Sequence, residues 1–193
     1  MLYIKIIILI YILSSIAEYS VHRYIMHNEA VIFYFYKKHR LHHNATNNDM
    51  SLNKKFKNYK MLGHEENLCL SGWESGLVFG SIIFIIAPLC IKIVGEKLNS
   101  KNAIISYIFA LILCLYAKVT WDTIHPYLHH ESPLKCGSFF TITDEKIINN
   151  FYYKWLMNNH KAHHIFKGNE KGNYNITLPF ADFIFGTYNT IKK

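Results

Sequence analysis

The sequence has only four cysteines, and none of them stands at a paired spacing. Cys90 and Cys114 lie inside apolar stretches, where a free thiol behaves as a small hydrophobic side chain. Cys69 and Cys136 stand alone elsewhere in the chain. This pattern argues against a disulfide framework and against a metal site built on cysteine.

The chain also lacks a nucleotide or flavin fingerprint, a fused haem domain, an internal repeat and a low-complexity linker. With 193 residues, it is expected to form one domain over residues 1–193. Acidic residues are scarce, 13 against 21 Lys and Arg, which gives a net charge of +8. Nucleic-acid-binding proteins rarely carry long apolar spans, so we expect no nucleic-acid partner and assign the charge to a membrane surface.

Long apolar runs are present. They cover about residues 2–20, 77–94 and 103–121, with Pro88 inside the second. Each approaches the ~20 residues that cross a ~30 Å hydrocarbon core. The sequence therefore predicts an all-α integral membrane protein with about three transmembrane helices, the last two joined as a hairpin by Gly95–Asn102. The apolar run Ala30–Tyr36 is too short to span, and we expect it at the interface or packed against the other helices.

Three crossings place residues 22–72 and 122–193 on the same side of the membrane. Seventeen of the 21 Lys and Arg lie in residues 22–72 and 118–193, eight and nine respectively. The positive-inside rule predicts that this side is cytosolic. The glycosylation acceptors Asn44 and Asn175 are then expected to stay unmodified. In an alternative interpretation, residues 1–17 form a cleaved signal peptide.

Histidine is the most informative residue type. Eleven of the twelve fall into four groups, and only His64, which we expect on a surface or loop, stands apart. The groups are His22 and His27; His39, His42 and His43; His125, His129 and His130; and His160, His163 and His164. Imidazole suits Fe, Zn, Cu and Ni, and one metal uses about three or four ligands. The number therefore predicts two adjacent metals.

The spacing within the groups supports convergence. His39 and His160 each begin an i, i+3, i+4 pattern, which shares one face of an α-helix. Pro126 places His125 at a helix kink or a helix start. His22 and His27 are five residues apart and converge only around a distortion such as a π-bulge.

The predicted metal ligands are ten of these histidines, and His130 is either an added ligand or a hydrogen-bonding support for one. The ten are His22, His27, His39, His42, His43, His125, His129, His160, His163 and His164. Clusters beside membrane spans also anchor lipid headgroups, but histidine is mostly uncharged at neutral pH, so lysine serves that purpose better.

The pattern resembles the fatty acid hydroxylase/sterol desaturase superfamily of integral-membrane oxygenases, and it is closest in motif to fatty acid 2-hydroxylases. The resemblance covers residues 17–188. It rests on Glu18–His27 (EYSVHRYIMH), His39–His43, His125–His130, His160–His164 and the closing Asn173–Thr187 (NYNITLPFADFIFGT). Two departures, a long stretch 131–159 and Pro126 in place of an aromatic residue, leave the substrate open.

The resemblance implies a cytosolic helical cap that holds two iron ions, with O₂ as co-substrate; zinc could occupy the same site. It implies that an acyl chain, ceramide or sterol is hydroxylated or desaturated in lipid biosynthesis at the endoplasmic reticulum. The electrons would come from a cytochrome b5-type protein or a ferredoxin. Glu18 and Asp182 are expected to orient imidazoles through hydrogen bonds, although Asp182 could instead cap a helix or form a surface ion pair.

Two other functions remain compatible with the sequence. A zinc-dependent membrane metallohydrolase would need neither O₂ nor a reductant. A non-catalytic metal-binding or transport protein would usually place its ligands near the membrane midplane, where this chain has no histidine.

Overall fold

The computed structural model describes residues 2–51, 53, 73–130, 142–166 and 171–191; His64, Cys69 and Cys136 lie outside them. Within these residues the protein is all-helical and has no strand. The elements are α1 (Leu2–Ser20), η1 (Val21–Met26), α2 (Phe33–Ala45), α3 (Trp73–Ser81), η3 (Ile82–Ile86), α4 (Ala87–Ile93), α5 (Lys101–Leu128), α6 (Glu145–Ile148), α7 (Phe151–Ile165) and α8 (Ala181–Ile184), where η marks a π-helical segment.

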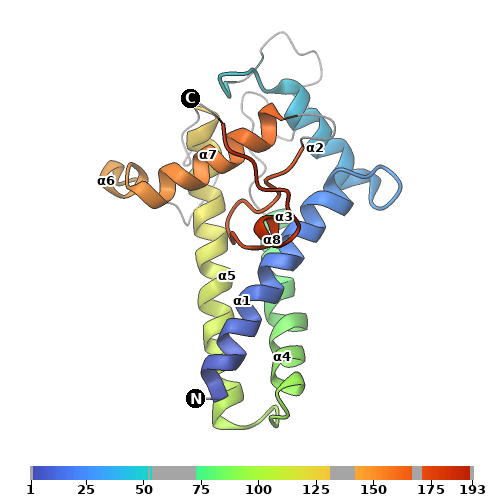
Figure 1. Ribbon diagram of the computed structural model, residues 1–193, viewed down its shortest axis with the longest axis vertical. Coiled ribbons are helices and arrows are strands. Elements are labelled where there is room, and N and C mark those ends of the chain that lie inside the picture. Colours follow the sequence, from blue (N-terminus) through green and yellow to red (C-terminus); the bar gives the residue numbers. More distant parts are fainter. Residues whose placement is uncertain (1, 52, 54–72, 131–141, 167–170, 192–193) are drawn as a thin grey trace.

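Three helical stretches run side by side as a column that carries a wider cap at one end (Figure 1). They are Leu2–Met26, Gly76–Ile93 and Lys101–Leu128, and each is long and apolar enough to cross a membrane. This confirms that three helices suited to crossing a membrane lie where the sequence predicts them. The third is longer than predicted because α5 continues past Trp121 to Leu128, so the same helix carries His125 into the cap.

Small residues allow the helices of the column to approach closely. Ala103, Ala110 and Ala117 recur every seven residues on α5 and are fully buried. Ile6 and Ile10 of α1 are buried in the same apolar cluster. Small side chains at helix contacts are typical of membrane proteins, where packing rather than burial from water drives association.

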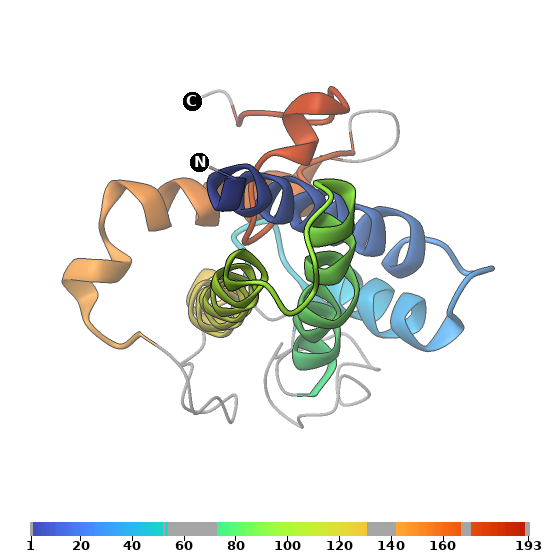
Figure 2. The ribbon, with the colours of Figure 1, turned by 90° about the horizontal axis from the view of Figure 1, so that it is seen from below.

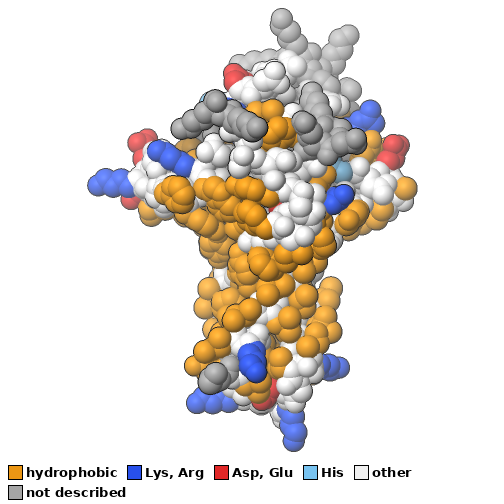
Figure 3. Space-filling model, viewed as in Figure 1, with side chains coloured by type: hydrophobic (Ala, Val, Ile, Leu, Met, Phe, Trp, Pro, Cys, Tyr) orange, Lys and Arg blue, Asp and Glu red, His pale blue; other side chains and the backbone are white. Residues whose placement is uncertain are grey.

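The outer surface of the column is apolar, in contrast to that of a soluble bundle. Figure 3 shows hydrophobic side chains covering the narrow part of the molecule, with Lys and Arg gathered at its end. Phe84 is 81% exposed and Ile85 is 64% exposed, both on η3. Ile8, Ile93, Ile104, Ile108, Ile112 and Leu115 are also exposed. Such a surface is suited to lipid as its solvent.

The predicted hairpin is confirmed, with α4 ending at Ile93 and α5 beginning at Lys101. The Ser100 side chain accepts a hydrogen bond from the backbone N–H of Ala103, which caps α5. Pro88 lies in the first turn of α4, where a missing N–H costs little. The π-helical segment η3 directly precedes α4. The helix therefore changes from π-helical to α-helical geometry just before Pro88 and continues through it.

The cap consists of α2, α6 and α7, which lie across the end of the column, and a tail, residues 171–191, that returns beside α1 (Figures 1 and 2). The tail is fixed to the first span. Tyr11 donates to the carbonyl of Pro179 and Ser15 to that of Leu178. The run 30–36 does not pack among the helices along its whole length, because residues 31–34 are exposed. This favours the interfacial alternative.

Candidate metal centre

Four helices carry the clustered histidines to one place on the cap side of the column. They are η1, α2, the last turn of α5 and the last turns of α7. The π-helical segment Val21–Met26 confirms the distortion predicted between His22 and His27. Their ring centroids lie 5.3 Å apart and their rings are stacked. A π-turn makes five residues cover about one turn, as four do in an α-helix.

The first histidine group consists of His22, His27, His39 and His163, whose nearest ring nitrogens all lie within 4.8 Å of one another. The Nε2 atom of His39 lies 3.1 Å from that of His22 and 2.9 Å from that of His27. The Nε2 atoms of His27 and His163 lie 3.1 Å apart. Four imidazoles from three elements therefore converge at one point.

Hydrogen bonds between the rings do not explain this convergence. The Nε2 atom of His39 has three ring nitrogens within 2.9–3.1 Å, those of His22, His27 and His43. A neutral imidazole nitrogen carries either one proton or one lone pair, so at most one of these contacts is a hydrogen bond. Adjacent ligands on one metal, bound at about 2.1 Å, lie about 3 Å apart. The donor set thus fits a metal ion.

Backbone carbonyls fix the tautomer of three rings. Nδ1 of His22 lies 2.7 Å from the carbonyl oxygen of Tyr174, and Nδ1 of His163 lies 2.8 Å from that of Gly172. Nδ1 of His129 lies 2.8 Å from the carbonyl oxygen of Met50. Because a carbonyl only accepts, each Nδ1 carries the proton and each Nε2 keeps its lone pair. This is the arrangement that a metal-binding histidine needs.

The second group consists of His42, His129, His160 and His164. The Nε2 atoms of His42 and His164 lie 3.1 Å apart. Nε2 of His129 and both ring nitrogens of His160 are buried and have no hydrogen-bond partner among the described residues. Buried polar atoms are nearly always paired, so a ligand that binds these nitrogens would account for them.

His43 and His125 adjoin the two groups without belonging to either. Nε2 of His43 lies 3.0 Å from that of His39 and 3.1 Å from that of His163, in the first group. Its ring centroid also lies 4.2 Å from that of His164, in the second. The ring of His125 lies 4.8 Å from that of His42. The structure brings all ten predicted ligands together, with His43 between the groups, and their binding of metal stays a prediction.

Burial keeps these imidazoles neutral. Outside the membrane spans it lowers the pKa of seven of them, and neighbouring imidazoles lower these values further: His27, His39, His42, His129, His160, His163 and His164. The pKa of His129 falls to about 4, and those of His39, His42, His160, His163 and His164 fall well below 6.5. Neutral rings have lone pairs available for a cation at physiological pH.

Lys171 is a contact that the sequence did not predict. Its Nζ lies 2.8 Å from Nδ1 of His27. Burial lowers the pKa of Lys171. The contact lies on the Nδ1 side of the His27 ring, while Nε2 of that ring faces His39 and His163.

Glu18 and Asp182 do not orient imidazoles directly, so this expectation is wrong for both. Among the described residues, each carboxylate accepts hydrogen bonds from the tail. Glu18 accepts from the backbone N–H groups of Thr177 and Leu178, at 2.9 Å each. Asp182 accepts from those of Tyr174 and Asn175, at 3.0 and 2.7 Å. The backbone N–H groups of the tail have no helical partner at these positions, and they donate to both carboxylates instead.

Of the two carboxylates, Asp182 is connected to the first histidine group through the backbone. Asp182 is 2% exposed and is the second residue of the four-residue helix α8, so a surface ion pair is excluded. It holds Tyr174, whose carbonyl binds His22. The acceptor Asn175 is 1% exposed, which makes it unsuited to glycosylation on either side of the membrane. Only the exposed Asn44 can therefore report on the orientation.

His130 lies outside both groups. It is exposed, has a positive φ of 59°, and its Nε2 lies 3.0 Å from the carbonyl oxygen of Asp49. The neighbouring carbonyl of Met50 binds His129. This position does not add His130 to either group, and its ring contacts the backbone beside the residue that binds His129. Pro126 does not begin a helix as one alternative held, because α5 runs through it to Leu128.

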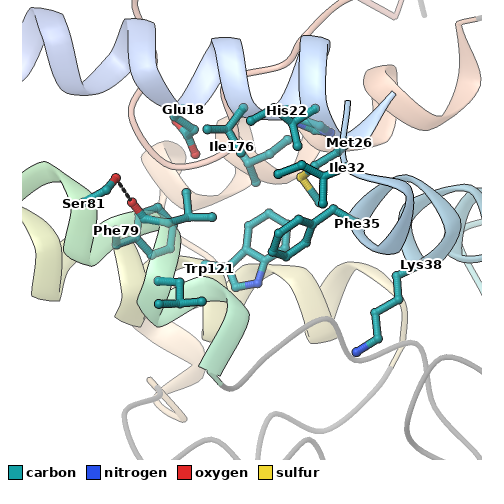
Figure 4. Close-up of a pocket in the computed structure, with 14 residues that line it drawn as sticks. Glu18, His22, Met26, Ile32, Phe35, Lys38, Phe79, Ser81, Trp121 and Ile176 are labelled. Carbon is teal, nitrogen blue, oxygen red and sulfur yellow. Dashed lines mark hydrogen bonds between the residues drawn. The ribbon is translucent and has the colours of Figure 1, made fainter. Parts of the chain in front are cut away.

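An apolar cavity of about 290 Å³ lies between η1, α2, α3 and α5 and reaches the first histidine group at His22 (Figure 4). Its lining includes His22 of the first group and Trp121. The Trp121 ring stacks on that of His125, with centroids 4.5 Å apart. A second cavity of about 300 Å³ borders His43, His163 and His164 and is lined largely by polar residues of the cap. The sequence predicted neither Trp121 nor the cavities, because they depend on how the helices pack.

No family model, curated protein or solved structure matches this chain.

Proposed function

We propose that the chain is an O₂-dependent lipid oxygenase of the fatty acid hydroxylase type, which uses two iron ions to hydroxylate or desaturate an acyl chain or sterol. One observation carries this proposal: two groups of four imidazoles, each with three buried members and one half-buried, lie together, and His22 of the first group lines an apolar cavity between helices long enough to span a membrane. Such a cavity holds a lipid beside the metals, and its apolar walls exclude water from the oxidised carbon.

His22, His27, His39 and His163 would hold one iron, and His42, His129, His160 and His164 the other. Bound there, iron would supply the redox chemistry that no side chain of this protein can provide. Hydroxylation takes one O₂, two electrons and two protons, inserts one oxygen into a C–H bond and releases one water. Desaturation takes the same inputs and releases two waters.

The electrons must come from another protein, for which we propose a cytochrome b5-type carrier or a ferredoxin. The basic face that carries the histidines would attract an acidic carrier, and this attraction weakens as salt rises. We further propose that this face is cytosolic and that the protein resides in the endoplasmic reticulum membrane. The count of Lys and Arg on each side of the spans supports that orientation.

The test is lipid mass spectrometry of cells that express the protein, against cells that express His163→Ala. Asn158→Ala is the matched control, because Asn158 is exposed on the same helix. A gain of one oxygen that depends on His163 supports hydroxylation, and a loss of two hydrogens supports desaturation. An unchanged lipid profile, despite iron loading and a working electron donor, contradicts the proposal. Activity with zinc and without O₂ would indicate a metallohydrolase instead.

A further inference from the structure

The two histidine groups are supported in different ways, and the support of the first is buried. The carbonyls of Tyr174 and Gly172 in the tail bind His22 and His163. Asp182 in turn accepts a hydrogen bond from the backbone N–H of Tyr174, at 3.0 Å. All three contacts are buried, so water does not compete with them.

The second group takes its carbonyl support from a short turn, residues 46–51, that follows α2. The carbonyl oxygen of Met50 lies 2.8 Å from Nδ1 of His129. Within the turn, Asp49 accepts hydrogen bonds from the backbone N–H and the hydroxyl of Ser51, at 3.0 and 2.6 Å. Both of these bonds are exposed, so water competes with them and each adds little stability.

Met50 also adopts a backbone conformation that costs free energy. Its φ is 76°, in the left-handed region that a residue with a Cβ rarely occupies. Such a conformation persists only where the surroundings hold it, and the Met50 side chain is 1% exposed. The carbonyl that supports His129 therefore depends on a turn that opens more easily than the tail.

A metal ion needs a path to its ligands, and the two cavities offer different paths. The apolar cavity reaches the first group at His22, and an ion there would lose water that its mostly apolar walls do not replace. The polar cavity is lined in part by Asn44, Asn47 and Asn48, which are all exposed. Their amide oxygens can replace water around a cation, so the polar cavity is the better path.

At the polar cavity the second group is the more accessible one. His164 of the second group is half-buried there, whereas His163 of the first group is fully buried. The half-buried member of the first group is His27, whose Nδ1 lies 2.8 Å from Nζ of Lys171. Among the described residues, Lys171 lines this cavity and His27 does not. Water in the cavity therefore meets the second group first.

We propose that the two sites hold their ions unequally. The second site exchanges its ion with water through the polar cavity, and Met50 is the positioning residue that controls the exchange by holding His129. The first site, with its buried supports, retains its ion. This inference rests on the two metal sites of the proposed function and goes beyond it, because it gives the two ions different lifetimes.

Release of zinc tests this without turnover. Full-length protein in nanodiscs is loaded with two Zn²⁺ per chain and mixed with a chromophoric chelator. We expect two phases of one ion each, with rates that differ by about tenfold or more, as the loss of one hydrogen bond provides. His160→Ala should remove the fast phase and His39→Ala the slow one. A single rate for both ions, or a fast phase that His39→Ala removes, overturns the proposal.

An exposed change in the turn tests its role without disturbing the buried chain. Asp49→Ala removes two hydrogen bonds and should speed the fast phase about threefold to tenfold, with the slow phase unchanged. Asp144→Ala is the matched control. Asp144 is also exposed and accepts from the backbone N–H two residues later, at 2.8 Å, but it lies at the start of α6. An unchanged fast phase in Asp49→Ala contradicts the role of the turn.

Two isomeric side chains test the backbone of Met50. Met50→Ile should speed the fast phase about tenfold, because a β-branched residue adopts a positive φ at a higher cost. Met50→Leu has the same volume without the branch at Cβ and should keep the wild-type rate. Equal rates in the two variants would show that the φ of this residue does not control release.

The path is tested by narrowing the polar cavity. Asn48→Trp adds an indole to its lining and should slow the fast phase, whereas Asn158→Trp, at an exposed position of α7, should not. An unchanged fast phase in Asn48→Trp contradicts this path. Because zinc release needs neither O₂ nor electrons, equal rates for two bound ions would contradict this inference alone. A protein that binds no second ion would contradict the proposed function as well.

Discussion

Asp182 connects the tail to the first histidine group, so Asp182→Asn should weaken both the fold and one metal site. The carboxylate accepts from two buried backbone N–H groups, at 3.0 and 2.7 Å, and from the Thr187 hydroxyl at 2.7 Å. In asparagine one oxygen becomes an NH₂ group, which cannot accept, so at least one buried N–H loses its partner. That loss costs about 1–3 kcal/mol, and the other bonds lose their charge assistance.

A total of about 2–4 kcal/mol is a large share of a domain's stability, which is about 5–15 kcal/mol. For a protein of this size it corresponds to a fall in Tm of about 5–15 °C. The metal content should fall from two ions toward one per chain. Tyr174 and Gly172 anchor His22 and His163 of the first group only, whereas the Met50 carbonyl anchors the second.

The assay combines thermal unfolding in nanodiscs with elemental analysis of the purified protein. Glu145→Gln is the matched control, because it removes the same charge from an exposed residue in the first turn of α6. The control should keep both its Tm and its metal content. An Asp182→Asn protein with two metals and an unchanged Tm would refute the idea that this carboxylate supports the first group.

Three further changes test other parts of the structure. Gly172→Ala should lower the free energy of unfolding by about 1–3 kcal/mol and reduce metal in the first group, because a Cβ there would overlap the backbone carbonyl of Thr187. Gly80 lies on a helix, and a Cβ there would meet no atom within 4 Å, so Gly80→Ala should raise that free energy by about 0.5–1 kcal/mol in the same assay. Inserting an alanine after Tyr24 should abolish the first site, whereas deleting Tyr24 should retain it. The deletion converts the i, i+5 pair His22 and His27 across η1 into an i, i+4 pair, which an α-helix places on one face. Metal analysis of both variants tests this. The metal-free protein should lose stability as the pH falls below 6.5, because the unfolded chain takes up a proton that the buried His129 ring, with its pKa of about 4, does not. For His129 alone the loss is about 3 kcal/mol at pH 4. Denaturant titrations measure it, and a free energy of unfolding that stays constant over this range would contradict the burial argument.

The elements of the fold could be predicted from local sequence, because length and apolarity suffice to identify membrane spans. The hairpin at Gly95 and the π-bulge between His22 and His27 also follow from spacing. The extension of α5 could not be predicted with certainty, because a proline in the last helical turn loses only one hydrogen bond that packing can offset.

The clustering of the histidines was predictable from the sequence, but the groups that support them were not. Histidine spacing brings two or three side chains to one face of each helix, and that information is local. The roles of Glu18 and Asp182 depend instead on where residues 173–178 return against α1, more than 150 positions later for Glu18. Lys171 and Trp121 carry no motif at all, since an amine beside His27 and an indole over His125 arise only from tertiary packing.

The metal content of the wild-type protein tests the central claim most directly. Full-length protein, purified from iron-replete cells without added chelator, is measured by elemental analysis against its chain concentration. Two adjacent sites predict two metal ions per chain in the wild type and a lower content when His39 of the first group or His160 of the second is replaced by alanine. A wild-type protein that binds no metal, or one ion that neither replacement removes, would contradict the account.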